Sequence, residues 1–273
     1  MISSEPLPGQ VKQTKAPRRR RGVRFEPPYA WIALLILLAA WELACDVFGV
    51  SSFLLPPPSA IAKDIGLHWR FFLPHIASTS LEVLIGFAIS IVLAIPLAVV
   101  LAFSRVLNRA LYPLIVGSQV VPKVAVAPLM LAWFGFGMAP KVAIIVTVAF
   151  FPVVINAVVG LRSVSPQMIH LARSMGASSL QTFCRFRLPH ALPNVFAGIK
   201  MASVLAVIGA VVAEFVGADS GLGYVILAAS STFDVTRQFS AILLLSALGM
   251  GFFWSIEWLE RLLIPWHRSG RVE

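Results

Sequence analysis

The chain has 273 residues, of which 58% are hydrophobic and 12% are charged, and its formal net charge is +10. A soluble domain usually carries about 25% charged residues, so this composition excludes an ordinary soluble protein and predicts a membrane protein. The length accommodates about six spans of ~20 residues. Two cysteines, Cys45 and Cys184, exclude a disulfide framework.

Residues 1–28 are rich in proline and basic side chains, including four consecutive arginines, Arg18 to Arg21. This stretch predicts a mobile cytoplasmic arm that has anionic lipid headgroups as a secondary partner. The apolar stretch that follows lacks a small-x-small cleavage site, which favours a retained signal anchor over a cleaved signal. A nucleic-acid-binding arm is the weaker alternative, and we expect no nucleic-acid partner.

Six apolar segments follow in chain order, at about 29–50, 77–103, 111–134, 141–160, 194–216 and 239–264. Between the first two, three prolines end at Pro58, and Ser59 is predicted to cap an amphipathic helix along the outer membrane surface. That helix would place four apolar side chains on one face: Ile61, Ile65, Trp69 and Phe72. Residues 218–238 are predicted to form an external segment with an amphipathic middle.

The distribution of lysine and arginine predicts the orientation of the spans. Sixteen of these residues fall on the side of the N-terminus and four on the opposite side. Cytoplasmic loops carry the excess of basic residues in membrane proteins, so both termini and the long loop at 161–193 are predicted to be cytoplasmic.

The loop at 161–193 is the longest polar interval after the first span. Ser165 and Pro166 form a helix start, because a hydroxyl can cap the first turn and the proline lacks an N–H that would be unpaired there. Gly176 predicts the end of this helix, since glycine adopts the left-handed conformation of a C-terminal cap. A second short helix is predicted from about Ser178, and Leu188-Pro189 is predicted to break it. A plain solvated linker, the alternative, would not need a capped helix with an apolar stripe.

This loop resembles the cytoplasmic loop of permease subunits in binding-protein-dependent ABC importers. The family pattern is Glu-Ala-Ala, then three residues, Gly, nine residues and Ile-x-Leu-Pro. This chain departs from it at two positions, with His170 in place of the Glu and Phe186 in place of the Ile. The resemblance extends from about residue 30 to 267. It implies an all-α, type I importer fold with a permease domain at 29–267 and a cytoplasmic tail at 268–273. The residues that it implies for docking an ATPase are Gln167, His170, Leu171, Ala172, Arg173, Gly176, Ala177, Leu188 and Pro189.

Polar residues within the spans are candidate markers of a translocation path. Lys123 follows Pro122 near the middle of the third span, with Gln119 one turn away. The pattern favours a cationic, hydrogen-bonding lining for an anionic or polar solute. A lysine that snorkels to an interface, or that pairs with an acid of a neighbouring span, is the alternative.

Two further intramembrane residues are weaker candidates for the path. Asn156 either lines the path or makes a helix–helix hydrogen bond. Glu214, near the outer end of the fifth span, either gates the outer mouth, pairs with Lys123 or is a simple interfacial acid. Glu42 and Glu82 are assigned no role.

The chain also resembles permeases of the nitrate, sulfonate, taurine, bicarbonate and pyrimidine-precursor importers. The residues that carry this resemblance include 122–129, 150–152, 213–215 and 265–267. It implies a bacterial inner-membrane permease, not an enzyme, that works by alternating access. The implied partners are two ATP-binding subunits, a second permease copy in a homodimer and a periplasmic or lipid-anchored solute-binding protein.

The sequence contains no Gly-rich loop ending in Gly-Lys-Ser/Thr, so the chain does not hold ATP by that route and no cofactor is expected. A secondary transporter or channel that does not use ATP is the alternative function. Such proteins favour inverted repeats with broken helices in matching positions, and the loop at 161–193 has no counterpart between the first two spans.

Overall fold

The computed structural model describes residues 29–266, and its elements within that range are all helical. The first half contains α1 (Tyr29–Val47), α2 (Pro58–Leu67), α3 (Trp69–Phe103), α4 (Arg105–Gly117), η1 (Ser118–Val120) and α5 (Lys123–Phe134). The second half contains α6 (Met138–Arg162), α7 (Pro166–Ser174), α8 (Ser179–Thr182), η2 (Phe183–Arg187), α9 (Leu188–Gly217), α10 (Leu222–Ser231) and α11 (Val235–Leu263). The all-α class is therefore confirmed. The predicted arm at 1–28 and tail at 268–273 lie outside the described residues.

Four continuous helices are long and apolar enough to cross a membrane: Trp69–Phe103, Met138–Arg162, Ser179–Gly217 and Val235–Leu263. In addition, α1 covers 19 residues of the predicted first span. The prediction of one continuous third span was wrong, because Arg105–Val120 and Lys123–Phe134 meet at 98°. Pro122 explains the break: a residue before proline is driven out of the α region, and Val121 has an extended backbone with ψ 124°.

The core is the packing of α6 against α9 and α3. Two glycines, Gly198 and Gly209, bring the backbones of these helices together. A Cβ on Gly198 would lie 2.7 Å from the carbonyl oxygen of Pro152, and one on Gly209 would lie 3.1 Å from the Cα of Ile145. Such close approach lets van der Waals contacts hold helices together where lipid supplies no hydrophobic driving force between them.

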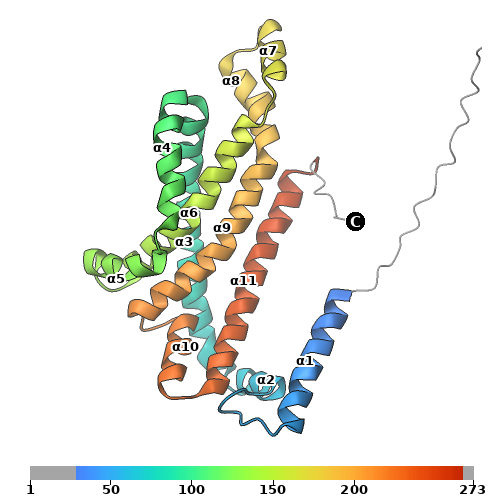
Figure 1. Cartoon of the computed structure of the whole chain (residues 1–273), viewed down its shortest axis with the longest axis vertical. Helices are drawn as coiled ribbons and strands as arrows, with labels where there is room; N and C mark the ends of the chain where they lie inside the picture. The colour runs from blue at the N-terminus through green and yellow to red at the C-terminus, as the bar shows by residue number, and fades with distance from the viewer. Residues whose placement is uncertain (1–28, 267–273) are drawn as a thin grey trace, which may run out of the picture.

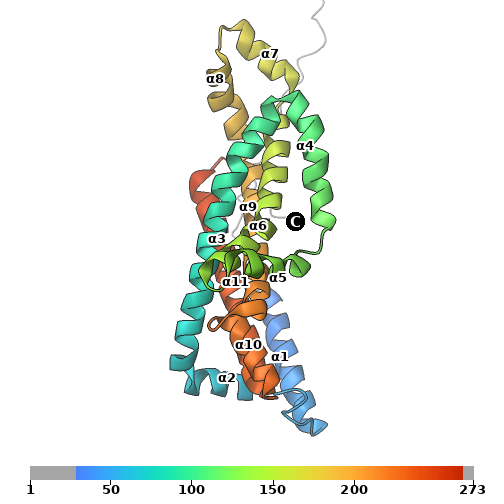
Figure 2. The ribbon, with the colours of Figure 1, turned by 90° about the vertical axis from the view of Figure 1, so that its left-hand side faces the viewer.

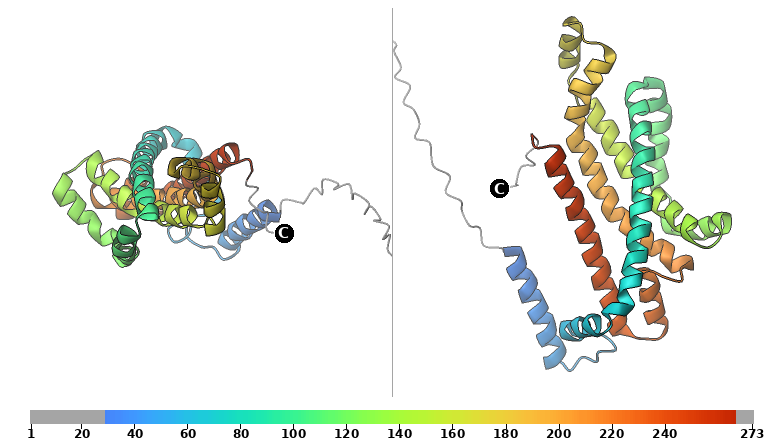
Figure 3. Two further views of the ribbon diagram at one scale, coloured as in Figure 1. Left: turned by 90° about the horizontal axis from the view of Figure 1, so that it is seen from above. Right: turned by 180° about the vertical axis from the view of Figure 1, so that it is seen from behind.

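The molecule is elongated and its two ends differ (Figures 1 and 2). The α3–α4 turn, α7 and α8 lie at one end, whereas α2 and α10 lie at the other. Figure 3 shows that α5 leaves the bundle sideways between these ends. The arginines of the first end and the basic residues of α2 and early α3 are therefore separated by the length of the bundle.

The segment around α2 differs from its prediction in two respects. Pro57, and not Ser59, occupies the N-cap position of α2. The N–H and Oγ of Ser59 instead donate to the carboxylate of Glu42, at 2.9 and 2.5 Å, and so tie α2 to α1. Trp69 and Phe72 belong to α3, because the chain turns at His68.

Candidate docking helix and translocation path

The helix α7 has the ends that the sequence predicts. The Oγ of Ser165 accepts a hydrogen bond from the N–H of Met168 at 3.4 Å, and Pro166 is the first helical residue. Gly176 adopts φ +82°, and its N–H donates to the carbonyl of Arg173 at 2.9 Å. These local bonds make α7 a short, defined helix at the end of the molecule.

The chain continues from this glycine into α8, as predicted. Ser178 and Gln181 form a capping box, in which each side chain bonds the backbone of the other. The predicted break at Leu188-Pro189 is wrong, because Ser179–Gly217 runs on as one helix of 39 residues. A π-helical segment, Phe183–Arg187, ends just before the proline, which falls in the first turn of α9 where its missing N–H costs little.

Apolar side chains stand exposed on one face of α7. Met168, Leu171 and Met175 are spaced by three and four residues and therefore share a face, and Leu171 is 62% exposed. Ala172 is buried instead, and its carbonyl accepts a hydrogen bond from Ala177 at 3.0 Å. An exposed apolar face on a rigid helix is a typical surface for binding a partner.

The two strongest path candidates lie together at the break between α4 and α5. Lys123 begins α5, and its Nζ donates to the backbone carbonyl of Gln119, 2.8 Å away. The same Nζ lies 5.7 Å from the centroid of the Phe151 ring in α6. Asn156, one turn further along α6, donates to the carbonyl of Pro152 at 2.8 Å, within its own helix.

Glu214 lies apart from Lys123 and is bound on both carboxylate oxygens. It is 1% exposed. The Oγ1 of Thr79 donates to one oxygen at 2.6 Å, and the N–H of Gly223 donates to the other at 2.5 Å. Thr79 in turn accepts from the N–H of Leu222 at 2.8 Å. Glu214 is therefore neither paired with Lys123 in this structure nor a simple interfacial acid; it holds the start of α10 against α3 and α9.

Sequence reasoning missed a buried ion pair close to Glu214. Lys141 and Glu82 form an ion pair of 2.7 Å, with side-chain exposures of 8% and 1%. Ser78 donates to the same carboxylate oxygen at 3.2 Å. The sequence pattern assigns no role to Glu82, and the structure corrects this because its carboxylate anchors Lys141. Opposite charges within two apolar segments were the signal that could have found the pair.

Replacing Gly221 by alanine tests the Glu214 contacts. Gly221 has φ +113°, and a Cβ there would overlap the carboxylate of Glu214. We expect a loss of about 2 kcal/mol in stability from backbone strain alone, seen as a lower midpoint of thermal unfolding in detergent. Gly137 is the matched control, because it has φ +114° and nothing lies within 4 Å of its added Cβ, so it carries the strain without the overlap. Equal midpoints for Gly221→Ala and Gly137→Ala would contradict the assignment.

These features define the class of the protein: a polytopic helical membrane protein with a break in one span and a protruding helix, α7, that exposes an apolar face. The family model for the inner membrane component of binding-protein-dependent transport systems matches residues 90–265. The chain belongs to this family.

Three relatives of known type support the assignment. The chain is 39% identical to a formylaminopyrimidine transport permease protein of Halalkalibacterium halodurans over 236 residues, which cover 86% of this chain and 94% of the relative. It is 36% identical to a riboflavin transport system permease protein of Chloroflexus aurantiacus over 262 residues, with 93% and 96% covered. It is 31% identical to a putative aliphatic sulfonates transport permease protein of Bacillus subtilis over 262 residues, with 93% and 92% covered.

The predicted importer group is therefore confirmed: the chain is an ABC importer permease of the sulfonate, taurine and pyrimidine group. Members of this family are transport components and not enzymes. The family and the long apolar helices place the chain in the inner membrane as a multi-pass protein that works with an ATPase and a binding protein.

Proposed function

We propose that the chain forms the path for a small anionic or polar solute and that α7 couples this path to ATP hydrolysis. The observation that carries the proposal is the exposed apolar face of α7 on a helix capped at both ends. The residues of the loop at 161–193 that the family pattern assigns to docking all lie on or beside α7, apart from Leu188 and Pro189 at the start of α9.

The solute path is proposed to pass the break between α4 and α5. Irregular backbone at membrane depth is tolerated only where protein buries it or where it lines a polar cavity. Lys123 and Gln119 lie at this break and supply a positive charge and an amide. The relatives named above carry formylaminopyrimidine, riboflavin and aliphatic sulfonates, and a solute with polar or anionic groups of this kind fits such a lining. Asn156 is proposed to line the path further along α6. Glu214 is proposed to gate the outer mouth.

The assembly is proposed to contain two copies of this permease and two ATPases. A two-fold axis gives each ATPase one α7 to bind. The orientation follows the charge: the α7 end carries the arginines and would face the cytoplasm together with both termini. A periplasmic or lipid-anchored binding protein would then meet the end that contains α2 and α10.

The energy of docking is of the right order for alternating access. Moving a two-state equilibrium from 1:99 to 99:1 requires about 5.5 kcal/mol of differential binding. Burying one large apolar side chain is worth about 1.5–3 kcal/mol, and each α7 exposes three. Two helices that dock differently in the two states can therefore supply this energy.

Reconstitution tests the proposal. The permease, its ATPase and its binding protein are placed in proteoliposomes, and uptake is compared for an aliphatic sulfonate, a formylaminopyrimidine and riboflavin. We expect uptake of one solute class only when ATP and the binding protein are both present. Uptake by the permease alone would support the alternative, a secondary transporter or channel, and would overturn the proposal.

A further inference from the structure

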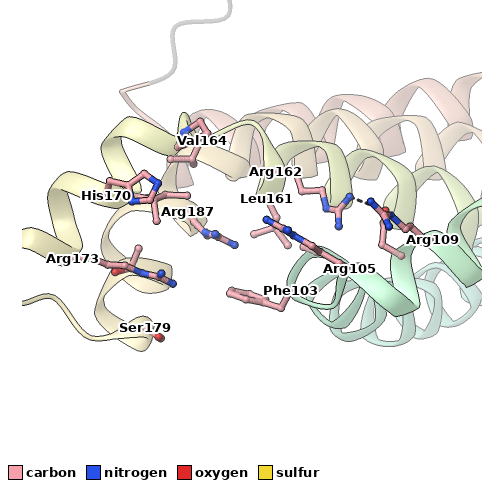
Figure 4. Close-up of a pocket in the computed structure, with 15 residues that line it drawn as sticks. Phe103, Arg105, Arg109, Leu161, Arg162, Val164, His170, Arg173, Ser179 and Arg187 are labelled. Atoms are coloured by element: carbon pink, nitrogen blue, oxygen red, sulfur yellow. Dashed lines mark hydrogen bonds between the residues drawn. The ribbon is translucent and has the colours of Figure 1, made fainter.

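A large basic cavity lies between the docking helix and the bundle, at the end that carries α7 (Figure 4). Its volume is about 700 Å³, within the range of about 300–1,000 Å³ that is usual for small-molecule sites. Five arginines line it: Arg105, Arg109, Arg162, Arg173 and Arg187. They come from α4, α6, α7 and η2, so the fold gathers them from distant parts of the chain. In Figure 4 the side chains of Arg105 and Arg187 point toward each other across the cavity.

The positive charge of this cavity is not neutralised within the described part of the chain. No aspartate or glutamate is among its lining residues, and none of the ion pairs found in residues 29–266 involves one of the five arginines. Their contacts are with neutral groups. Arg162 donates to Asn108 at 2.7 Å, and Arg187 lies 5.0 Å from the centroid of the Phe103 ring. Positive charges held together in one concave site raise the local concentration of anions.

We propose that this cavity binds a phosphate-bearing anion that bridges α7 to the α3–α4 turn. The planar guanidinium group matches the geometry of phosphate oxygens through paired hydrogen bonds, and several arginines from different elements can grip one such group. Ser179 adds a neutral hydroxyl at the rim. The source of the phosphate is either a lipid headgroup, since the turn after Phe103 ends an apolar span, or a soluble phosphate compound.

The two faces of α7 separate this site from the exposed apolar face that is proposed for docking. Ile169, His170 and Arg173 line the cavity, although the family pattern counts His170 and Arg173 among its docking residues. Leu171 and Met175 lie on the other side of the helix and are exposed. The family pattern has an acid at the position of His170, which would offset part of the arginine charge. Histidine leaves the cavity without an acid. A bound anion would therefore set the position of α7 relative to the bundle without occupying the face that is proposed to meet the ATPase.

The binding test uses the full-length permease without its partners, so its result does not depend on the proposed coupling role. In the first arm, protein stripped of lipid in dodecyl maltoside is titrated with inorganic pyrophosphate, and thermal unfolding is followed at constant ionic strength with chloride. In the second arm, protein is assembled in phosphatidylglycerol nanodiscs and released for native mass spectrometry. A saturable rise in the unfolding midpoint identifies a soluble phosphate, and retained phosphatidylglycerol identifies a lipid headgroup.

Two variants of the cavity and one control variant test whether the arginines bind the anion. Arg105→Gln combined with Arg109→Gln is expected to raise the half-saturating pyrophosphate concentration at least tenfold and to abolish lipid retention. His170→Glu is expected to weaken binding in the same direction. Lys63→Gln combined with Arg70→Gln removes the same charge at the far end of the bundle and should behave as wild type.

The proposal is overturned if wild-type protein shows neither a saturable shift nor retained phospholipid. It is equally overturned if both double variants bind as wild type does. A separate titration with the ATPase covers the other occupant: if the ATPase raises the unfolding midpoint and neither pyrophosphate nor phospholipid binds, an acidic surface of that protein fills the cavity and a phosphate ligand is rejected.

Discussion

Leu171→Asp is expected to abolish ATP-coupled uptake while the protein remains folded in the membrane. Leu171 is 62% exposed on α7, so aspartate there disturbs no core packing in the isolated chain. In a docked complex the same change would place a charge in an apolar contact. Losing the burial of one leucine removes about 1.5–3 kcal/mol, which corresponds to roughly tenfold to 100-fold weaker association, and the buried charge adds to that loss.

The measurement has two readouts and a matched control. Co-purification of the ATPase with the permease reports association, and ATP-dependent uptake in proteoliposomes reports coupling. Val106→Asp is the control, because Val106 is 77% exposed at the same end of the molecule but lies on α4. The control is expected to retain the ATPase and to transport. Wild-type association and uptake by Leu171→Asp would show that α7 is not the docking element.

The parts of the fold that depend on local sequence were predictable. The cap at Ser165 and the left-handed Gly176 require only residues within one or two turns, and the structure contains both. The apolar spans follow from composition over ~20 residues, which a bilayer demands of any crossing helix. The importer family was predictable for a similar reason, since the spacing of Ala172, Gly176 and Leu188-Pro189 is a local pattern.

The parts that depend on neighbours in space were not predictable in the same way. A proline in an apolar stretch either kinks, breaks or begins a helix, and its surroundings decide which. Pro122 breaks its span at 98°, whereas Pro189 follows a π segment and lies within a continuous helix. The partner of Glu82 lies 59 residues away at Lys141, and no local pattern specifies such a pair. The arginine cavity likewise exists only once four elements have come together.

The helices α6 and α9 connect α7 to the buried Lys141–Glu82 pair and to Glu214. The helix α6 carries Lys141 in its first turn and Arg162 at the end that leads into α7, and α9 carries Glu214 near its C-terminal end. These two helices also pack closely at Gly198, where an added Cβ would lie 2.7 Å from the carbonyl oxygen of Pro152. Closely packed helices therefore connect α7 to the buried ion pair near the opposite end of the bundle.

Lys141→Met is expected to destabilise the protein by about 3–5 kcal/mol. The substitution removes one partner of a buried ion pair and leaves the carboxylate of Glu82 without its counter-charge, which is the costly way to break such a pair. One oxygen of that carboxylate has no hydrogen-bond partner among residues 29–266, and after the substitution the neutral hydroxyl of Ser78 is left as the side-chain donor to the other oxygen. Thermal and denaturant unfolding in detergent measure the loss.

A double variant distinguishes lost pairing from lost packing. Adding Glu82→Gln to Lys141→Met neutralises the stranded carboxylate and keeps an acceptor for Ser78, so we expect it to recover a large part of the lost stability. Arg261→Met is the control, since it breaks a 2.6 Å ion pair whose arginine is 71% exposed, and exposed pairs are worth about 0–1 kcal/mol. If Lys141→Met were as mild as the control, or if the double variant were less stable than either single variant, the buried pair would not be what secures α6 to α3.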